Sequence, residues 1–216
     1  MKPLLFCAFF YLTLINCVFG ELQTQDTIPE GHRRIQIYEL GSHIQQRYHV
    51  SVCFEDLASK GKGALDGVFY NPSDFDLSKL SLSETLAKMK NDRVSFITNS
   101  SCLIFRPTEF SRYESPLAEK MSPFKLTGSL GELVDYLAES NTNMMFSEAI
   151  SESDRTLVFQ KISLHFNSPV SIEDVLLSLT KEYGITWMAT SPVNPKENPL
   201  GKYYIEFAFI PRDAVF

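Results

Sequence analysis

The 216-residue chain has only four histidines and four cysteines, and it has no concentrated positive charge. Its four histidines, His32, His43, His49 and His165, form no pair at zinc-ligand spacing with one another or with a cysteine, so we expect no metal site. Lysines and arginines are scattered along the chain, and the formal net charge is −6. This balance argues against nucleic acid or anionic lipid as the main partner.

The sequence also lacks a catalytic or cofactor-binding motif. Cys53 and His49 could be imagined as a nucleophile and its base, but positions four apart along a strand are more than about 10 Å apart. The acidic stretch 66–76 matches no EF-hand spacing, and the glycine-rich stretch 59–63 lacks the Walker order. We therefore expect a protein that is not an enzyme and that carries no cofactor.

The longest apolar run lies at the N-terminus. Lys2 precedes a nearly all-apolar stretch at 4–15, and residues 18–20 are small or tolerated before a cleavage point. This layout predicts a secretory signal peptide at 1–20, with residues 21–31 as a flexible lead-in. The alternative is an uncleaved N-terminal anchor, which would be the only contact of the chain with a membrane. In either case we expect a periplasmic or secreted protein.

Cysteine usage agrees with export. Cys7 and Cys17 would leave with the signal peptide, so the pair that remains is Cys53 and Cys102, both in β-like runs of the first half. An exclusive pair in an oxidising compartment is commonly bridged, and closing a loop of about 50 residues would contribute roughly 4 kcal/mol. The alternative is two buried strand cysteines that never meet.

The sequence does contain an internal repeat, in which matching residues lie about ninety positions apart. Residues 81–86 open an amphipathic stretch that leads into an apolar run at 94–96, and residues 171–176 do the same before 185–187. Two amphipathic stretches further upstream also match, by Leu40 with Leu133, Ile44 with Leu137 and Phe54 with Phe146. Chance matches would not preserve the order of neighbouring elements, so the pattern predicts a duplicated domain.

Helical and strand periodicities follow one another in the same order in both halves. The order helix, strand, strand, helix, strand, strand predicts an α+β fold class with two tandem small α-β-β-α-β-β sandwich domains. We expect the first domain at 32–106, a proline-rich linker at 107–123 and the second domain at 124–216. Near alternation from 155 to 166 predicts a long strand in the second domain, with one slip around 160–161.

Helix boundaries have clear local signals. Ser81 with Glu84, and Ser129 with Glu132, have the spacing of a capping box, in which the serine and the acidic side chain each bond the other's backbone N–H. A third helix is expected to start at Ser171, where Asp174 takes the acidic position. This helix is expected to end at Gly184, because glycine readily adopts the left-handed conformation of a helix terminus.

The second half contains two sequence segments that resemble a known family. Residues 162–176 (ISLHFNSPVSIEDVL) and 183–187 (YGITW) resemble the secretin and TonB short N-terminal domain, abbreviated STN. Residues 77–86 are a weaker copy, with Asp92-Arg93 in place of the glycine before the aromatic strand. The resemblance implies a bacterial module of the periplasm or outer membrane that acts by protein contact. Its partner would be a secretin, a TonB-dependent receptor or a component of an anti-sigma system.

These expectations combine into an exported, non-enzymatic protein-interaction module of the bacterial cell envelope. The alternative is a small-ligand or glycan binder that uses the cleft between the repeats, and a hydrolase is a weaker third hypothesis. The last strand, which contains Tyr203, Tyr204, Glu206 and Phe207, is expected at a sheet edge, where it could recruit a partner strand by β-augmentation. Its alternative role is packing, with every second residue facing the core.

Overall fold

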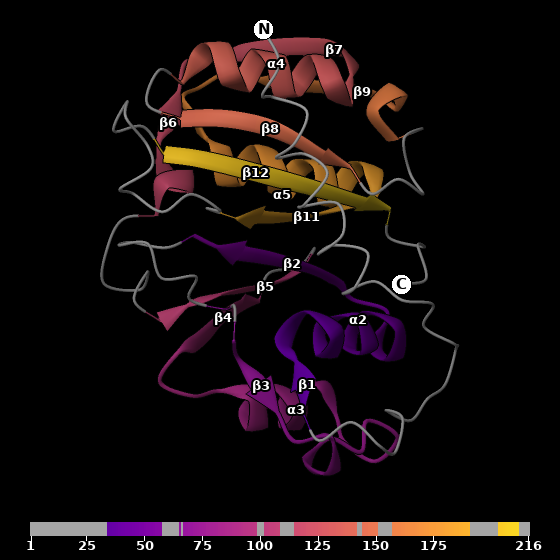
Figure 1. Cartoon of the computed structure of the whole chain (residues 1–216). Coiled ribbons are helices and arrows are strands. Elements are labelled where there is room, and N and C mark those ends of the chain that lie inside the picture. The colour runs from indigo at the N-terminus through magenta and orange to yellow at the C-terminus, as the bar shows by residue number, and fades with distance from the viewer. Residues whose placement is uncertain are drawn as a thin grey trace, which may run out of the picture.

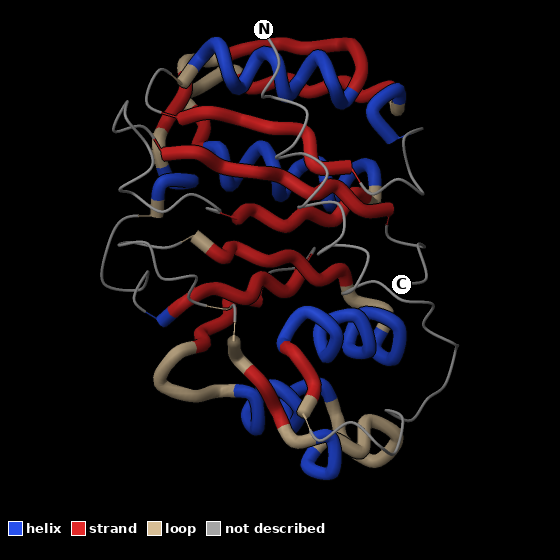
Figure 2. Tube along the Cα trace, viewed as in Figure 1, coloured by secondary structure: helices blue, strands red, loops and turns tan. Residues whose placement is uncertain are grey.

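The computed structural model describes residues 34–57, 65, 67–98, 102–108, 115–141, 144–150, 157–190 and 203–211, and for 144–150 and 203–211 it describes the backbone alone (Figure 2). The expected signal peptide at 1–20 and the lead-in at 21–31 lie outside the described residues. The fold is of mixed α and β type, in agreement with the predicted α+β class.

In the first half, two helices alternate with strands. The helices are α2 (Ile37–Tyr48) and α3 (Leu82–Met89). The strands are β1 (Ile35–Gln36), β2 (Ser51–Asp56), β3 (Phe69–Tyr70), β4 (Val94–Thr98) and β5 (Cys102–Pro107). From α2 onward the order is the predicted one: helix, strand, strand, helix, strand, strand.

The second half has a similar order, except that three strands instead of two lie between its helices. Its helices are α4 (Leu130–Ser140) and α5 (Ile172–Tyr183). Its strands are β6 (Lys120–Met121), β7 (Phe124–Ser129), β8 (Met144–Ile150), β9 (Lys161–Phe166), β10 (Val170–Ser171), β11 (Ile185–Thr190) and β12 (Tyr203–Pro211). The long strand predicted at 155–166 begins only at Lys161, because residues 157–159 form a 3-10 turn.

The predicted helix caps are confirmed. At the start of α3 the Ser81 side chain accepts from the Glu84 backbone N–H while the Glu84 carboxylate accepts from Ser81 N, and α4 begins with the same reciprocal pair at Ser129 and Glu132. Helix α5 ends at Gly184, whose φ of 67° is left-handed. These local bonds satisfy backbone groups that the first and last turns leave unpaired.

A single six-stranded sheet runs through both halves, in the order β4-β5-β2-β11-β12-β8 (Figure 1). Three neighbouring strands come from the first half and three from the second. The halves meet where β2 and β11 pair in parallel, with Met188 opposite Phe54, Ala189 opposite Glu55 and Thr190 opposite Asp56. We call this β2–β11 pairing the junction.

Strand β12 lies inside this sheet, which corrects the expectation that Tyr203, Tyr204, Glu206 and Phe207 form an edge. The backbone of β12 pairs in antiparallel fashion with β11 on one side and in parallel with β8 on the other. All four residues face a register partner on β8. Within the part of the chain that is described, the edge strands of the six-stranded sheet are therefore β4 and β8.

The helices form layers on the sheet. In the first half, one apolar cluster joins α2 and α3 to the small antiparallel pair β1–β3 and to the six-stranded sheet. In the second half, α4 and α5 lie near the pair β7–β9 (Figure 1). The core of the first half includes Leu40, Phe54 and Phe105, with the last two rings stacked at a centroid distance of 5.5 Å.

The second apolar cluster crosses the boundary between the halves. It joins residues of α4, α5, β9 and β11 to Cys53, Leu57, Cys102 and Ile104 of the first half. Alternation along β2 explains this, because Val52 and Phe54 face the first cluster while the residues between and after them face the second. Strand β2 is thus covered by apolar side chains from both halves.

Part of the segment expected as a linker belongs to the core. Residues 115–121 are described, and they contain a 3-10 turn at Pro116–Ala118 followed by β6, which pairs with β10. Leu117 and Met121 are buried in the cluster that crosses the boundary. This part of the segment is fixed against α5 and does not run free between the halves.

Candidate functional site

Strand β4 forms an edge of the six-stranded sheet. Among the described strands it pairs with β5 alone, with Phe96 opposite Phe105 and Ile97 opposite Ile104. Phe96 packs edge-on against Phe105 at a ring-centroid distance of 6.5 Å, which fixes the strand to the first core. Ile97 is 38% exposed and is one of three large hydrophobic side chains at the surface of the described residues.

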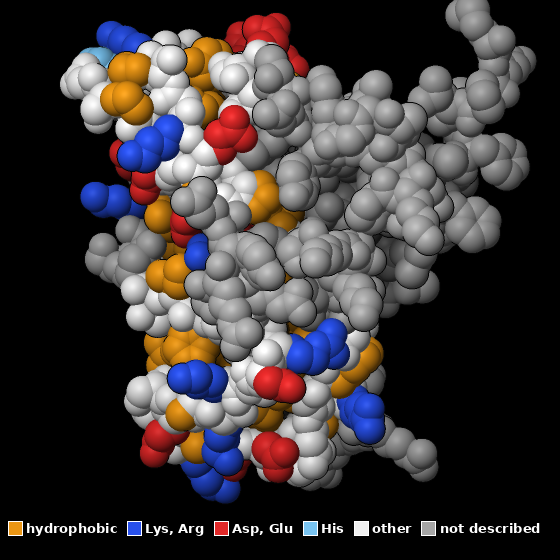
Figure 3. All heavy atoms as spheres, turned by 90° about the vertical axis from the view of Figure 1, so that its left-hand side faces the viewer, with side chains coloured by type: hydrophobic (Ala, Val, Ile, Leu, Met, Phe, Trp, Pro, Cys, Tyr) orange, Lys and Arg blue, Asp and Glu red, His pale blue; other side chains and the backbone are white. Residues whose placement is uncertain are grey.

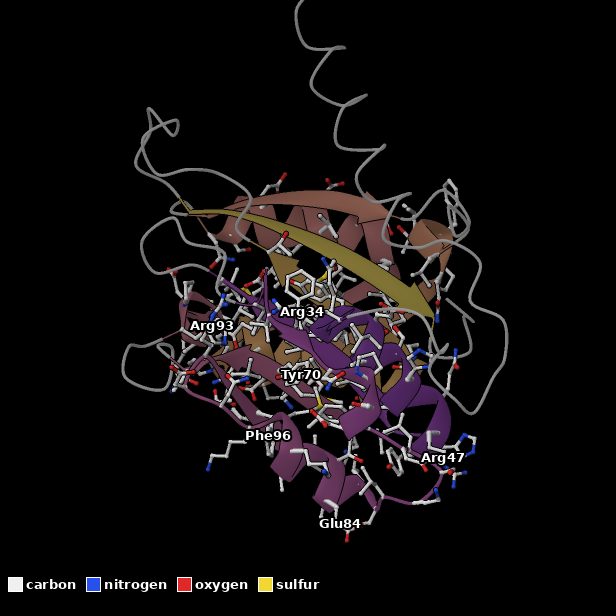
Figure 4. The ribbon with its side chains drawn as sticks, turned by 60° about the horizontal axis from the view of Figure 1, so that its bottom comes forward. Arg34, Arg47, Tyr70, Glu84, Arg93 and Phe96 are labelled. Carbon is white, nitrogen blue, oxygen red and sulfur yellow. The ribbon has the colours of Figure 1, made fainter. Side chains whose placement is uncertain are left out.

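The composition of β4 leaves this edge unprotected. Its five residues, Val94-Ser95-Phe96-Ile97-Thr98, include neither a charge nor a proline, the two features that usually prevent an edge strand from pairing. The turn before the strand is fixed, because Asn91 accepts from the backbone N–H groups of Arg93 and Val94 at 2.8 and 2.9 Å. The Arg93 side chain donates to the carbonyl of Gly67, and Figure 4 labels Arg93 and, in β4, Phe96.

Strand β8 forms the opposite edge. Its seven residues pair in parallel with β12 from Tyr203 opposite Met144 to Phe209 opposite Ile150. Helix α4 lies next to β8, as α2 lies next to β2 (Figure 1). Since α2 leaves β2 free to pair with β11, a helix in this position does not block the edge of its strand.

Four polar residues meet at the junction and form what we call the buried ion cluster: Glu55 of β2, Arg106 of β5, Ser115, and Glu173 of α5. The Arg106 guanidinium lies 2.8 Å from Glu55 Oε2 and 2.8 Å from Glu173 Oε1. Ser115 donates its hydroxyl to Glu55 Oε1 and accepts from the backbone N–H of Leu117. The cluster thereby connects three segments that are distant in sequence.

The carboxylate of Glu55 is fully buried, and this burial raises its pKa. The Arg106 charge and the Ser115 hydrogen bond act in the opposite direction, while the Glu173 charge raises the pKa further. A buried charge of this kind is costly unless it is paired, so Arg106 holds the two carboxylates together. The ion pairs with Arg106 connect α5 to the first half.

The two cysteines of the described chain are buried free thiols. Ser51 lies opposite Cys102 and Cys53 opposite Ile104, so the cysteines are diagonal neighbours on adjacent strands. With strands about 4.8 Å apart and a rise of about 3.3 Å per residue, the Cα atoms of such neighbours are about 8 Å apart, beyond the usual reach of a disulfide. The bridge that the sequence suggested is therefore not formed, although the two side chains do meet, since a hydrogen bond to Cys102 contributes to the Cys53 pKa.

Burial raises the pKa of the Cys53 thiol well above its usual range. Its Sγ lies 3.7 Å from the Thr180 hydroxyl of α5, so this thiol also lies at the junction. Because the thiolate is the reactive form, we expect Cys53 to react with iodoacetamide at pH 8 at least about tenfold more slowly in the native protein than in urea. Peptide mass spectrometry would measure this rate. Equal rates in the two solvents would contradict it, and the introduced thiol of Phe69→Cys, at a 44% exposed position, supplies the fast native control.

Sequence reasoning did not single out the buried ion cluster. The available signal was one acidic and one basic residue within two apolar strands, SVCFED and CLIFRP. The histidines, by contrast, are placed apart: His43 is buried in α2, where burial lowers its pKa, and His165 is exposed on β9. Among the described residues, no group of three His, Cys, Asp or Glu side chains could hold a metal ion.

The surface in Figure 3 mixes basic, acidic and apolar side chains over its described part, without a large area of one charge. No helix within the described ranges is long and apolar enough to span a bilayer. Comparison with known proteins found no matching family model, no similar curated protein and no similar solved structure. The likeness to the STN family therefore stays a prediction.

Proposed function

We propose that the chain is an exported, non-enzymatic protein-interaction module of the bacterial cell envelope, built from two tandem domains of the STN type. Support for the duplication comes from strand pairing. In the first half, β2 pairs in parallel with β5, and β5 pairs in antiparallel fashion with β4. In the second half, β8 pairs in parallel with β12, and β12 pairs in antiparallel fashion with β11.

Each half therefore contributes three strands to the six-stranded sheet. In both halves the strand that comes third along the chain lies between the first and the second. The small sheets fit the same correspondence, because β1–β3 and β7–β9 are both antiparallel pairs whose strands precede the two helices of their half. Two copies of one fold that share a sheet favour a binding role, since an active site is normally built once.

The observation that carries the function is the edge of β4. This strand has an unpaired outer side, no charge, no proline and an exposed isoleucine, which suits it to accept a strand from another protein. The family resemblance names the class of partner: a secretin, a TonB-dependent receptor or an anti-sigma component. The expected signal peptide would bring the chain to the periplasm, where it could meet these proteins.

Within the described residues, the space between the halves is occupied by side chains, which disfavours a ligand site in a cleft there. The junction is filled by Cys53, Leu179 and Trp187, which are all buried, and by the ion cluster. A binding pocket needs a hollow with converging polar groups. The two carboxylates of the cluster are instead paired with Arg106.

Two surface variants test the proposal. Ile97→Lys puts a charge on the β4 edge, whereas Phe69→Lys makes the same kind of change at an exposed residue of β3, outside the six-stranded sheet. Each chain would be immobilised and exposed to envelope extract, and the retained protein would then be purified and its Kd measured. We expect a secretin, receptor or anti-sigma component whose affinity falls at least about tenfold with Ile97→Lys only.

Two outcomes would overturn the proposal. One is that no envelope protein is enriched by the wild-type chain over an unrelated exported control. The other is that the retained protein binds the Ile97→Lys and wild-type chains equally well, because binding then does not use the β4 edge.

A further inference from the structure

The junction shows how two edges of this fold pair. Strand β2 is the first sheet strand of its half, and β11 is the second sheet strand of the other half. Both are outer strands of their own three-stranded unit, and they meet in parallel. The junction is therefore a pairing of a first-strand edge with a second-strand edge.

The edges that remain unpaired in the described chain are one of each kind. Strand β8 is the first sheet strand of the second half, and β4 is the second sheet strand of the first half. The β8 edge therefore corresponds to the β2 edge, and the β4 edge corresponds to the β11 edge. Since β2 and β11 pair at the junction, the edges at the two ends of the sheet are complementary in the same way.

Strand direction agrees with this complementarity. Strand β4 is antiparallel to β5, and β5, β2 and β11 run parallel to one another; β12 and β8 run opposite to β11. Strands β4 and β8 therefore run in the same direction. When one molecule follows another along the sheet, β8 of the first meets β4 of the second in parallel, as β2 meets β11.

We propose that this chain associates head to tail with further copies of itself, with the β8 edge of one copy pairing in parallel with the β4 edge of the next. This inference rests on the strand correspondence set out under the proposed function, but it requires no envelope partner. The contact is heterologous, so each added copy again presents one β4 edge and one β8 edge.

The expected contact is weaker than the junction. At the junction, helix α5 adds side-chain contacts to the strand pairing. Its Thr180 contacts Cys53, and its Glu173 accepts a hydrogen bond from Arg106. In the contact between copies, the corresponding helix is α3, which has eight residues where α5 has twelve. Association should therefore depend on concentration, as in small transient interfaces.

Sedimentation equilibrium of the purified chain over a wide concentration range tests the association. The average mass of the wild-type chain should rise steadily with concentration, without a plateau at the dimer, because the series is open. Ile97→Lys should remain at the monomer mass and Phe69→Lys should follow the wild type. A wild-type chain that stays monomeric at every concentration, or one that stops at a dimer, overturns the inference.

Thiol cross-linking identifies the edges. Ile97→Cys on β4 and Ser147→Cys on β8 would be mixed, treated with a short bifunctional maleimide and compared with each variant alone. Since Cys53 and Cys102 are buried and common to all samples, they serve as background. We expect cross-linked dimers in the mixture at least several-fold above either variant alone; equal yields, or dimers of Ile97→Cys with itself, overturn the head-to-tail pairing.

The two proposals can fail separately. An envelope protein that binds wild type and not Ile97→Lys, together with a monomeric wild-type chain, removes self-association and keeps the docking function. Open-ended association of the wild-type chain without any enriched envelope protein does the reverse.

Discussion

Replacing Arg106 with methionine is expected to lower the free energy of unfolding by about 3–5 kcal/mol, because the variant leaves a buried carboxylate without its partner. Glu55 is fully buried and lies 2.8 Å from the guanidinium, which also binds Glu173 of α5. Urea unfolding followed by far-UV circular dichroism would measure the change.

The double variant Glu55→Leu with Arg106→Met supplies the control. It removes both charges, so it should recover most of the stability that the single variant loses. If the double variant is as unstable as Arg106→Met alone, the loss comes from packing and not from an unpaired charge.

The loss in Arg106→Met should also depend on pH. Burial already raises the pKa of Glu55 in the wild type, and removal of the arginine raises it further. An acid whose folded pKa lies above its unfolded pKa contributes stability that is lost as pH rises through the folded value. The difference between Arg106→Met and wild type should therefore be smaller at about pH 5 than at about pH 8. A difference that grows on acidification would contradict this assignment.

Replacing Trp187 with alanine is expected to cost about 3–5 kcal/mol. The indole is 1% exposed, and it lies in the apolar cluster that joins α4, α5 and β11 to Cys53 and Ile104 of the first half. Its removal leaves a cavity among residues of both halves, so one variant should weaken the whole molecule. Urea unfolding by circular dichroism measures this, because Trp187 is the chain's single tryptophan and its fluorescence is lost in the variant.

Phe159→Ala is the matched control, since it removes a large aromatic side chain that is 76% exposed and should change stability by less than about 0.5 kcal/mol. In the wild-type protein, Trp187 fluorescence and circular dichroism should give the same unfolding transition, because the cluster connects the halves. Two separate transitions would show that the halves unfold independently.

Local features of this fold could be predicted from the sequence because their causes lie within a few residues. Ser81 and Glu84 cap α3, and Gly184 ends α5, through bonds that span three to five positions. Alternation likewise predicts that His165 faces solvent while Leu164 faces the core, as the structure has them. The order of the helices and of most longer strands follows from the same periodicities, whereas strands β1, β6, β7 and β10 lie outside that prediction.

Strand neighbours could not be predicted in this way. Alternation in β12 indicates which residues share a face, but it carries no information on whether another strand lies beside them, and β12 proved to be central. The buried ion cluster was missed for a related reason. Glu55 and Glu173 are more than a hundred positions apart, so only the pairing of β2 with β11 brings them to one arginine.

The pairing of β2 with β11 also has a consequence for the time course of folding. Phe54 and Met188 face each other across about 130 residues of chain, so the N-terminal part emerges from the ribosome long before its neighbouring strand has been synthesised. During that interval Glu55 lacks the α5 cover, and the outer side of β2 can pair with a strand of another chain. A delay in synthesis between the two halves would lengthen this interval.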